Sequence, residues 1–73
     1  MIVISYKKRD GLDWFRMYKE FKDDDRMKST AKAKSFITYC NEQNKKSNNN
    51  PKYMNFRIIV GGRRISPNEL LDL

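Results

Sequence analysis

The side chains of residues 53–60 constrain the fold most, because apolar residues recur there with the period of two that a β-strand requires. The apolar set is Met54, Phe56, Ile58 and Val60, and the alternate set is Tyr53, Asn55, Arg57 and Ile59. A strand with so apolar a face buries it against a second layer. We therefore expect Met54 and Phe56 to face the core, and Tyr53 and Arg57 to be exposed on the opposite face of the sheet.

The second layer is predicted to be one long helix that begins between Arg26 and Thr30 and ends near Lys46. Its buried stripe has the helical spacing i, i+3, i+4, i+7 and consists of Ala33, Phe36, Ile37 and Cys40. Aspartates at 23–25 precede the helix and lysines at 45–46 end it, as the helix dipole favours. The aspartate run lacks the glycine and glutamate spacing of a calcium loop, so we attribute it to helix-end electrostatics and predict no metal site.

The first 22 residues predict a β-hairpin. Residues 2–8 alternate like a strand, with Ile2, Ile4 and Tyr6 on one face, and Asp10-Gly11 is a strong turn signal. Residues 13–22 are ambiguous. Helical spacing is present among Trp14, Met17, Tyr18 and Phe21. The aromatic enrichment and the preceding turn favour a second strand, which we choose, with the helix as the alternative.

The remaining segments predict short connections and a small C-terminal appendage. Residues 47–51 form a loop by composition, and Gly61-Gly62 turns the chain into a short edge strand at 63–65. Ser66 to Glu69 resembles a capping box, so residues 67–71 should form a helical turn. The expected fold is a small two-layer α+β domain of β-β-α-β order, spanning residues 1–73, whose antiparallel sheet carries the helix on one face.

The composition argues against an enzyme. The chain has no histidine, the commonest general base near neutral pH, and no phosphate-cradling glycine-rich loop. Its one cysteine, Cys40, lies on the predicted core stripe, so neither a disulfide nor an ordinary Cys/His zinc site is available. We expect no catalytic residues and no cofactor. A chain of 73 residues without such staples often gains stability by forming a homodimer.

The net charge of +7, from 16 basic and nine acidic residues, favours a polyanionic partner. No segment has the roughly 20 apolar residues that span a bilayer, so we expect no membrane association. The N-terminal residues do not resemble a signal peptide, which predicts a cytoplasmic protein. The Lys-, Asn- and Ile-rich composition is similar in general character to that of short accessory proteins of large phages.

Three sets of residues are candidates for binding. The sheet face opposite the helix should carry Lys7, Trp14, Arg16, Tyr18, Tyr53 and Arg57, although for Trp14 we favour burial in the core. Lysines 28, 32 and 34, with 45 and 46, line the helix, and Arg63-Arg64 follow the glycine turn. The predicted nucleic-acid-binding residues are Lys7, Lys8, Arg9, Arg16, Tyr18, Lys32, Lys45, Lys46, Tyr53, Arg57, Arg63 and Arg64.

Exposed rings flanked by cations suit single-stranded nucleic acid, since bases stack on the rings and cations neutralise phosphates. We therefore expect a non-catalytic nucleic-acid-binding protein, with RNA favoured. The alternative is a small inhibitor or adaptor that docks onto an acidic host protein and blocks or redirects it, because the same residues would accelerate encounter and hold a protein partner.

Overall fold

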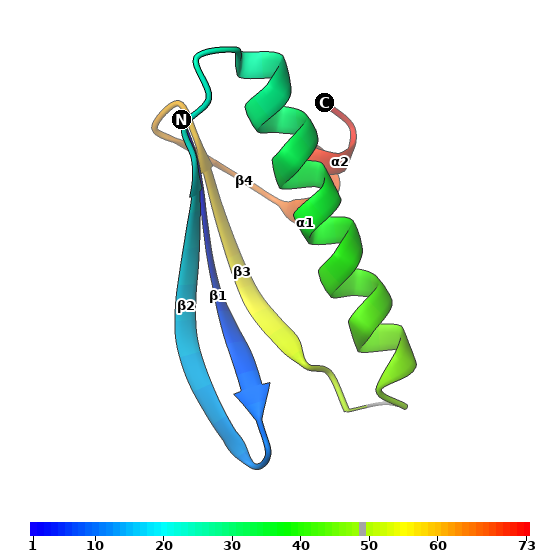
Figure 1. Cartoon of the computed structure of the whole chain (residues 1–73). Coiled ribbons are helices and arrows are strands. Elements are labelled where there is room, and N and C mark those ends of the chain that lie inside the picture. The colour runs from blue at the N-terminus through cyan, green and yellow to red at the C-terminus, as the bar shows by residue number, and fades with distance from the viewer. Residues whose placement is uncertain (49) are drawn as a thin grey trace.

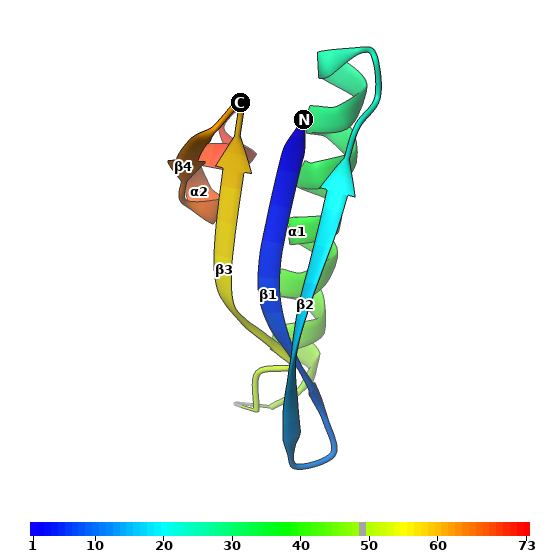
Figure 2. The same ribbon diagram turned by 90° about the vertical axis from the view of Figure 1, so that its left-hand side faces the viewer.

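The computed structural model describes residues 1–48 and 50–73 and has two layers (Figure 1). In chain order the elements are β1 (Ile2–Asp10), β2 (Asp13–Phe21), α1 (Arg26–Lys46), β3 (Tyr53–Val60), β4 (Arg63–Ile65) and α2 (Pro67–Leu71). The strands form one antiparallel sheet in the order β2-β1-β3-β4, and α1 lies across one face of it (Figure 2). The predicted α+β fold and its β-β-α-β order are confirmed. The predicted loop at 47–51 contains Asn49, which lies outside the described residues.

The β1–β2 hairpin resolves the ambiguity of residues 13–22. Gly11 has φ +63°, a conformation that glycine adopts without steric cost at the first central position of a type II′ turn. Pairing then continues without interruption from Asp10 opposite Asp13 to Ile2 opposite Phe21. The strand prediction is therefore confirmed and the helical alternative is wrong, since the turn aligns β2 with the full length of β1.

The core lies between α1 and the central strands. Its buried members are Ile2, Ile4 and Tyr6 of β1, Ala33, Ile37 and Cys40 of α1, Tyr53 and Ile58 of β3, and Leu70 of α2. Phe36 packs against this cluster, so the predicted helix stripe is confirmed. Asp25 caps the helix, since its side chain accepts a hydrogen bond from the Met27 N–H at 2.9 Å. None of the helices in the described part of the chain is long and apolar enough to span a bilayer.

A bulge in β3 overturns two of the predicted side-chain orientations. Ser5 pairs with Arg57 and Lys7 pairs with Met54, so Asn55 and Phe56 together lie opposite Tyr6. Asn55 is the extra residue and has φ +56°. Because one additional residue reverses the alternation before it, Tyr53 faces the core and is only 6% exposed, whereas Met54 is half-buried on the opposite face. The expected exposure of Tyr53 and the expected core position of Met54 are both wrong.

The helix leaves the turn end of the β1–β2 hairpin uncovered. Figures 1 and 2 show the turn of the hairpin projecting past the end of α1. The first eight of the nine residues of β2 are exposed, and only Phe21 packs against the core. Trp14 is 37% exposed, so its expected burial is wrong, because it lies on the face of the sheet opposite α1.

Candidate functional site

The face of the sheet opposite α1, called the open face below, is rich in cations. Pairing places residues of adjacent strands on the same face, so Lys7 of β1 lies beside Arg16 of β2, and Ser5 lies between Tyr18 of β2 and Arg57 of β3. Arg64 of β4 pairs with Ile59 and joins the same face. The open face therefore gathers side chains from all four strands.

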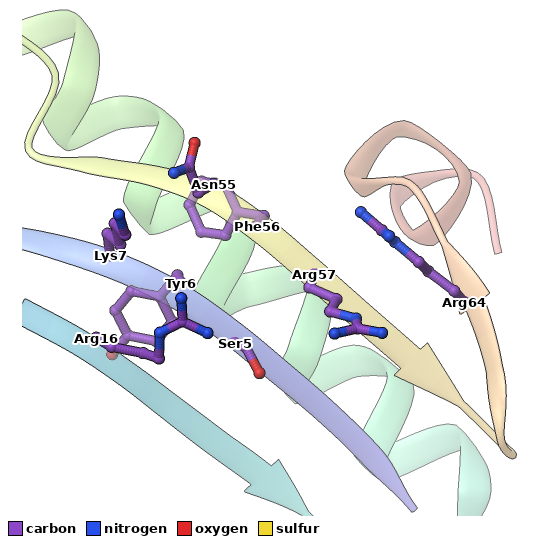
Figure 3. A pocket seen from close by; sticks show the side chains of 8 residues that line it. All are labelled: Ser5, Tyr6, Lys7, Arg16, Asn55, Phe56, Arg57 and Arg64. Atoms are coloured by element: carbon purple, nitrogen blue, oxygen red, sulfur yellow. The ribbon is translucent and has the colours of Figure 1, made fainter.

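Four of these cations surround a shallow hollow of about 420 Å³. Its lining consists of Ser5, Tyr6, Lys7, Arg16, Asn55, Phe56, Arg57 and Arg64 (Figure 3). Figure 3 shows α1 behind the sheet, and Arg16, Arg57 and Arg64 on the near side. The bulge places Asn55 at the border of the hollow, where its side chain points away from Arg16 and Arg57. The lining contains no carboxylate, so the local charge is positive throughout.

The cations of the hollow are not neutralised by ion pairs. Across residues 1–48 and 50–73, the two ion pairs join Lys22 to Glu20 at 2.7 Å and Lys32 to Asp23 at 3.0 Å. Neither involves a residue of the hollow. An anion that entered it would meet guanidinium and ammonium groups that have no competing carboxylate partner within the described part of their own chain.

Two exposed aromatic rings lie on the open face beside the hollow. Tyr18 is 68% exposed, because its β1 neighbour is the small Ser5. Trp14 lies four pairs away along β2, opposite Arg9, with Arg16 midway between the two rings on the same face. Alternation along the strand thus gives the sequence ring, cation, ring on one face. Such an arrangement can stack planar groups while holding a negative charge between them.

Other predicted site residues have structural contacts away from the hollow. Tyr53 packs edge-on against Tyr39 at 6.2 Å between ring centroids, and burial, with a hydrogen bond to Tyr39, raises the pKa of Tyr53 to about 12. The Lys8 Nζ lies 6.0 Å from the Tyr53 ring centroid on the helix side of the sheet. Arg9 donates a hydrogen bond to the Asn50 carbonyl oxygen at 3.1 Å. These residues connect the sheet to the segment before β3.

The helix lysines do not form one continuous surface. Lys32 pairs with Asp23, whose pKa this contact lowers, and Lys34 donates to the main-chain oxygen of Leu73. Lys45 and Lys46 are exposed at the C-terminal end of α1, in the other layer. The structure therefore does not bring the predicted helix set together with the cations of the sheet.

The two arginines of the glycine turn separate. Gly61 and Gly62 both have positive φ, +57° and +80°, as a type I′ turn requires. Successive strand residues point to opposite faces, so Arg64 reaches the open face while Arg63 borders a different hollow, which Asp23 and Asp24 also line. Only Arg64 of this predicted pair belongs to the site.

The residues that sequence reasoning missed are Ser5 and Asn55. Ser5 is the small neighbour that leaves Tyr18 exposed, and Asn55 is the bulge residue. The signal for Asn55 was its residue type, since asparagine tolerates positive φ better than other non-glycine residues. Cys40 carries no chemistry here, because burial raises the pKa of its thiol to about 11 and keeps it protonated near neutral pH.

Comparison of the chain with protein-family models, with curated proteins and with solved structures found no match. The fold and the geometry of the open face are therefore the basis for any functional conclusion.

Proposed function

We propose that this protein binds single-stranded nucleic acid on the open face, without catalysis, and that it favours RNA. The observation that carries the proposal is the convergence of Lys7, Arg16, Arg57 and Arg64 on one hollow that has no carboxylate in its lining. Phosphate oxygens match the forked donors of arginine, and the hollow offers three arginines from three strands.

The rings beside the hollow would hold the bases. A base stacked on an exposed ring contributes roughly 1–3 kcal/mol, and Tyr18 and Trp14 offer two such rings flanking Arg16. Ser5 and Asn55 also line the hollow, and their hydroxyl and amide groups can exchange hydrogen bonds with a ribose 2′-hydroxyl. These polar groups support the preference for RNA over DNA. The buried Tyr53 takes no part.

Salt dependence gives the first test. With four phosphate contacts, the logarithm of the binding constant should fall against the logarithm of salt with a slope of about −3 for a single strand. Fluorescence anisotropy would be measured with labelled single-stranded RNA, single-stranded DNA and duplex DNA, beginning at low salt. We expect the RNA to bind most tightly. Absence of binding to any of them, or a flat salt dependence, would overturn the proposal.

A charge-matched pair of variants locates the site. Arg16→Gln with Arg57→Gln removes two cations from the hollow, and we expect roughly a 30-fold or larger loss of affinity, because each charged hydrogen bond contributes about 1.5–3 kcal/mol. The salt slope should fall to about half. Lys45→Gln with Lys46→Gln removes the same charge from the exposed end of α1 and should change affinity far less. The opposite ranking would assign binding to the helix.

Nuclease digestion distinguishes the alternative, in which the partner is an acidic protein, from the nucleic-acid proposal. A protein partner should remain bound to the tagged chain after nuclease digestion, and a nucleic-acid ligand should not. Freshly purified protein with a raised ratio of absorbance at 260 nm to that at 280 nm, lost on nuclease treatment, would support the nucleic-acid proposal.

A further inference from the structure

Strand β2 is a long, unprotected sheet edge. It lies at one end of the sheet order, and its outward N–H and C=O groups have no strand beside them. Proteins protect such edges with short strands, charged side chains, proline or bulges, and of these devices β2 has only charged side chains, such as Arg16 and Lys19. At the other edge, β4 is three residues long, whereas β2 has nine residues, no proline and an uninterrupted register with β1. Of the two edges, only β2 is suited to pairing with another strand.

Both faces of β2 also carry exposed apolar side chains. Trp14 and Tyr18 lie on the open face, and Phe15 and Met17 lie on the helix side, where they are 51% and 41% exposed. Monomeric proteins rarely leave large apolar side chains clustered in this way. A strand added beside β2 would cover Phe15 and Met17 on the helix side, and on the open face it would lie beside Trp14 and Tyr18, the rings of the proposed nucleic-acid site.

The sequence of β2 is complementary to itself in an antiparallel arrangement. With a two-fold axis at Tyr18, Arg16 lies opposite Glu20 of the other copy, and this opposite-charge pair occurs twice. Glu20 also pairs with Lys22 of its own chain at 2.7 Å, so the two cations would share its carboxylate. The same register places Phe15 opposite the partner's Phe21, also twice, and the two Tyr18 rings side by side. We propose that a second copy of this chain pairs with β2 in this register and forms a continuous eight-stranded sheet.

Repulsion between like charges excludes several of the other registers in which two copies of β2 could pair. An axis at Arg16, Lys19 or Glu20 places each of these residues opposite its own copy, and like charges directly opposite are destabilising. An axis at Met17 avoids like charges but leaves Arg16 opposite Tyr18 and Glu20 opposite Trp14, without an ion pair. At the ends of the proposed register Asp13 meets the partner's Asp23, whose charge Lys32 already compensates.

The charge pair gives a reversible test of the dimer. Sedimentation equilibrium of nuclease-treated protein should show dimers in the wild type, and Glu20→Arg should weaken dimerisation at least tenfold by placing arginines opposite each other. The double variant Arg16→Glu with Glu20→Arg restores opposite charges and should recover dimerisation. Glu42→Arg makes the same charge change on the exposed side of α1 and should leave the dimer intact.

Disulfide trapping tests the register. In a Cys40→Ala background, Tyr18→Cys places two thiols opposite each other across the axis, within disulfide reach, and should give covalent dimers on mild oxidation. Met17→Cys should trap far less, because each Met17 lies opposite the partner's Lys19. Preferential trapping of Met17→Cys would overturn the proposed register. A monomer at all concentrations, or association insensitive to Glu20→Arg, would overturn the dimer.

The dimer and the nucleic-acid site can fail separately. The dimer is measured without nucleic acid, and Glu20→Arg retains every cation of the hollow. A monomeric Glu20→Arg that still binds RNA supports both proposals. A wild-type dimer that binds no RNA supports the dimer alone.

Discussion

Asn55 determines which side chains of β3 reach the open face. It is the extra residue opposite Tyr6 and adopts a positive φ there. The strand residues before it therefore lie on the opposite face from the one that strict alternation predicts. Tyr53 then packs in the core, with its ring 5.9 Å from that of Tyr6. Without the bulge inside the strand, an uninterrupted alternation from Phe56 back to Tyr53 would leave that ring in solvent.

The conformation of Asn55 predicts an unusual order of substitutions. Asn55→Gly should leave the free energy of unfolding within about 0.5 kcal/mol of the wild type, because glycine adopts positive φ freely. Asn55→Val should cost roughly 1–2 kcal/mol, although valine is the better strand former, because a β-branched residue is strained there. Urea denaturation measures both. Arg57→Val, at an exposed position of ordinary strand conformation, is the control and should change stability little.

Residue-level predictions from the sequence succeeded where alternation is regular and failed where it is not. The faces of Ile2, Ile4 and Tyr6 were correct because β1 follows a strict period of two. Tyr53 was placed on the wrong face because a bulge adds a residue without changing the composition of the strand. Exposure of Trp14 was also missed, since its place on the face opposite α1 follows from the pairing of β2 with β1, which no local pattern encodes.

Asn44 fixes how helix α1 is joined to strand β3. Its Oδ1 accepts hydrogen bonds from the N–H groups of Lys52 and Tyr53, both at 2.8 Å, and its Nδ2 donates to the Tyr53 carbonyl oxygen at 2.9 Å. One side chain thus satisfies three main-chain groups at the point where the chain enters β3. This contact stabilises the inward position of Tyr53.

Removal of the Asn44 amide should therefore destabilise the whole fold. Asn44→Leu leaves three partly buried main-chain groups without a partner and should cost roughly 2–4 kcal/mol. Asn44→Asp retains the acceptor and loses the donor, so its loss should be intermediate. Thermal and urea unfolding measure both effects. Asn41→Leu, exposed on the same helix, should change stability by less than about 0.5 kcal/mol, and an equal loss there would refute the role assigned to Asn44.

Most of the helices and strands could be predicted from the sequence, because the hydrophobic periodicity and the capping residues that define them are local features. The bounds of α1 follow from its apolar stripe and from Asp25, and α2 begins where Ser66 accepts a hydrogen bond from the Glu69 N–H. Segment 13–21 was ambiguous by itself and became a strand because the turn at Gly11 pairs it with β1. Pairing with β1 therefore made this segment a strand, which the spacing of its own apolar residues did not determine.

In the part of the chain that the structure describes, β2 contributes to both proposals, since its edge would pair with the second copy while its Trp14, Arg16 and Tyr18 lie on the open face. In the proposed dimer the two-fold axis is perpendicular to the sheet, so both open faces lie on the same side. Each face brings its own Arg16 and Tyr18 close to the axis, because both residues belong to β2. A strand of RNA that crosses the axis would meet two basic hollows in succession.

This arrangement predicts that affinity depends on the length of the RNA. A strand of about 8 nucleotides occupies one hollow, since a small domain covers roughly 4–16 nucleotides, whereas one of about 24 can reach both and gains from effective concentration. We expect the longer RNA to bind the wild type at least tenfold more tightly, beyond the statistical factor for multiple sites. Glu20→Arg should abolish this ratio while leaving the affinity for the short RNA undiminished, because the monomer retains its hollow. Anisotropy titrations of both lengths, with Glu42→Arg as the charge-matched control, measure the ratio directly. An unchanged ratio in Glu20→Arg would show that the length dependence arises within one copy of the chain.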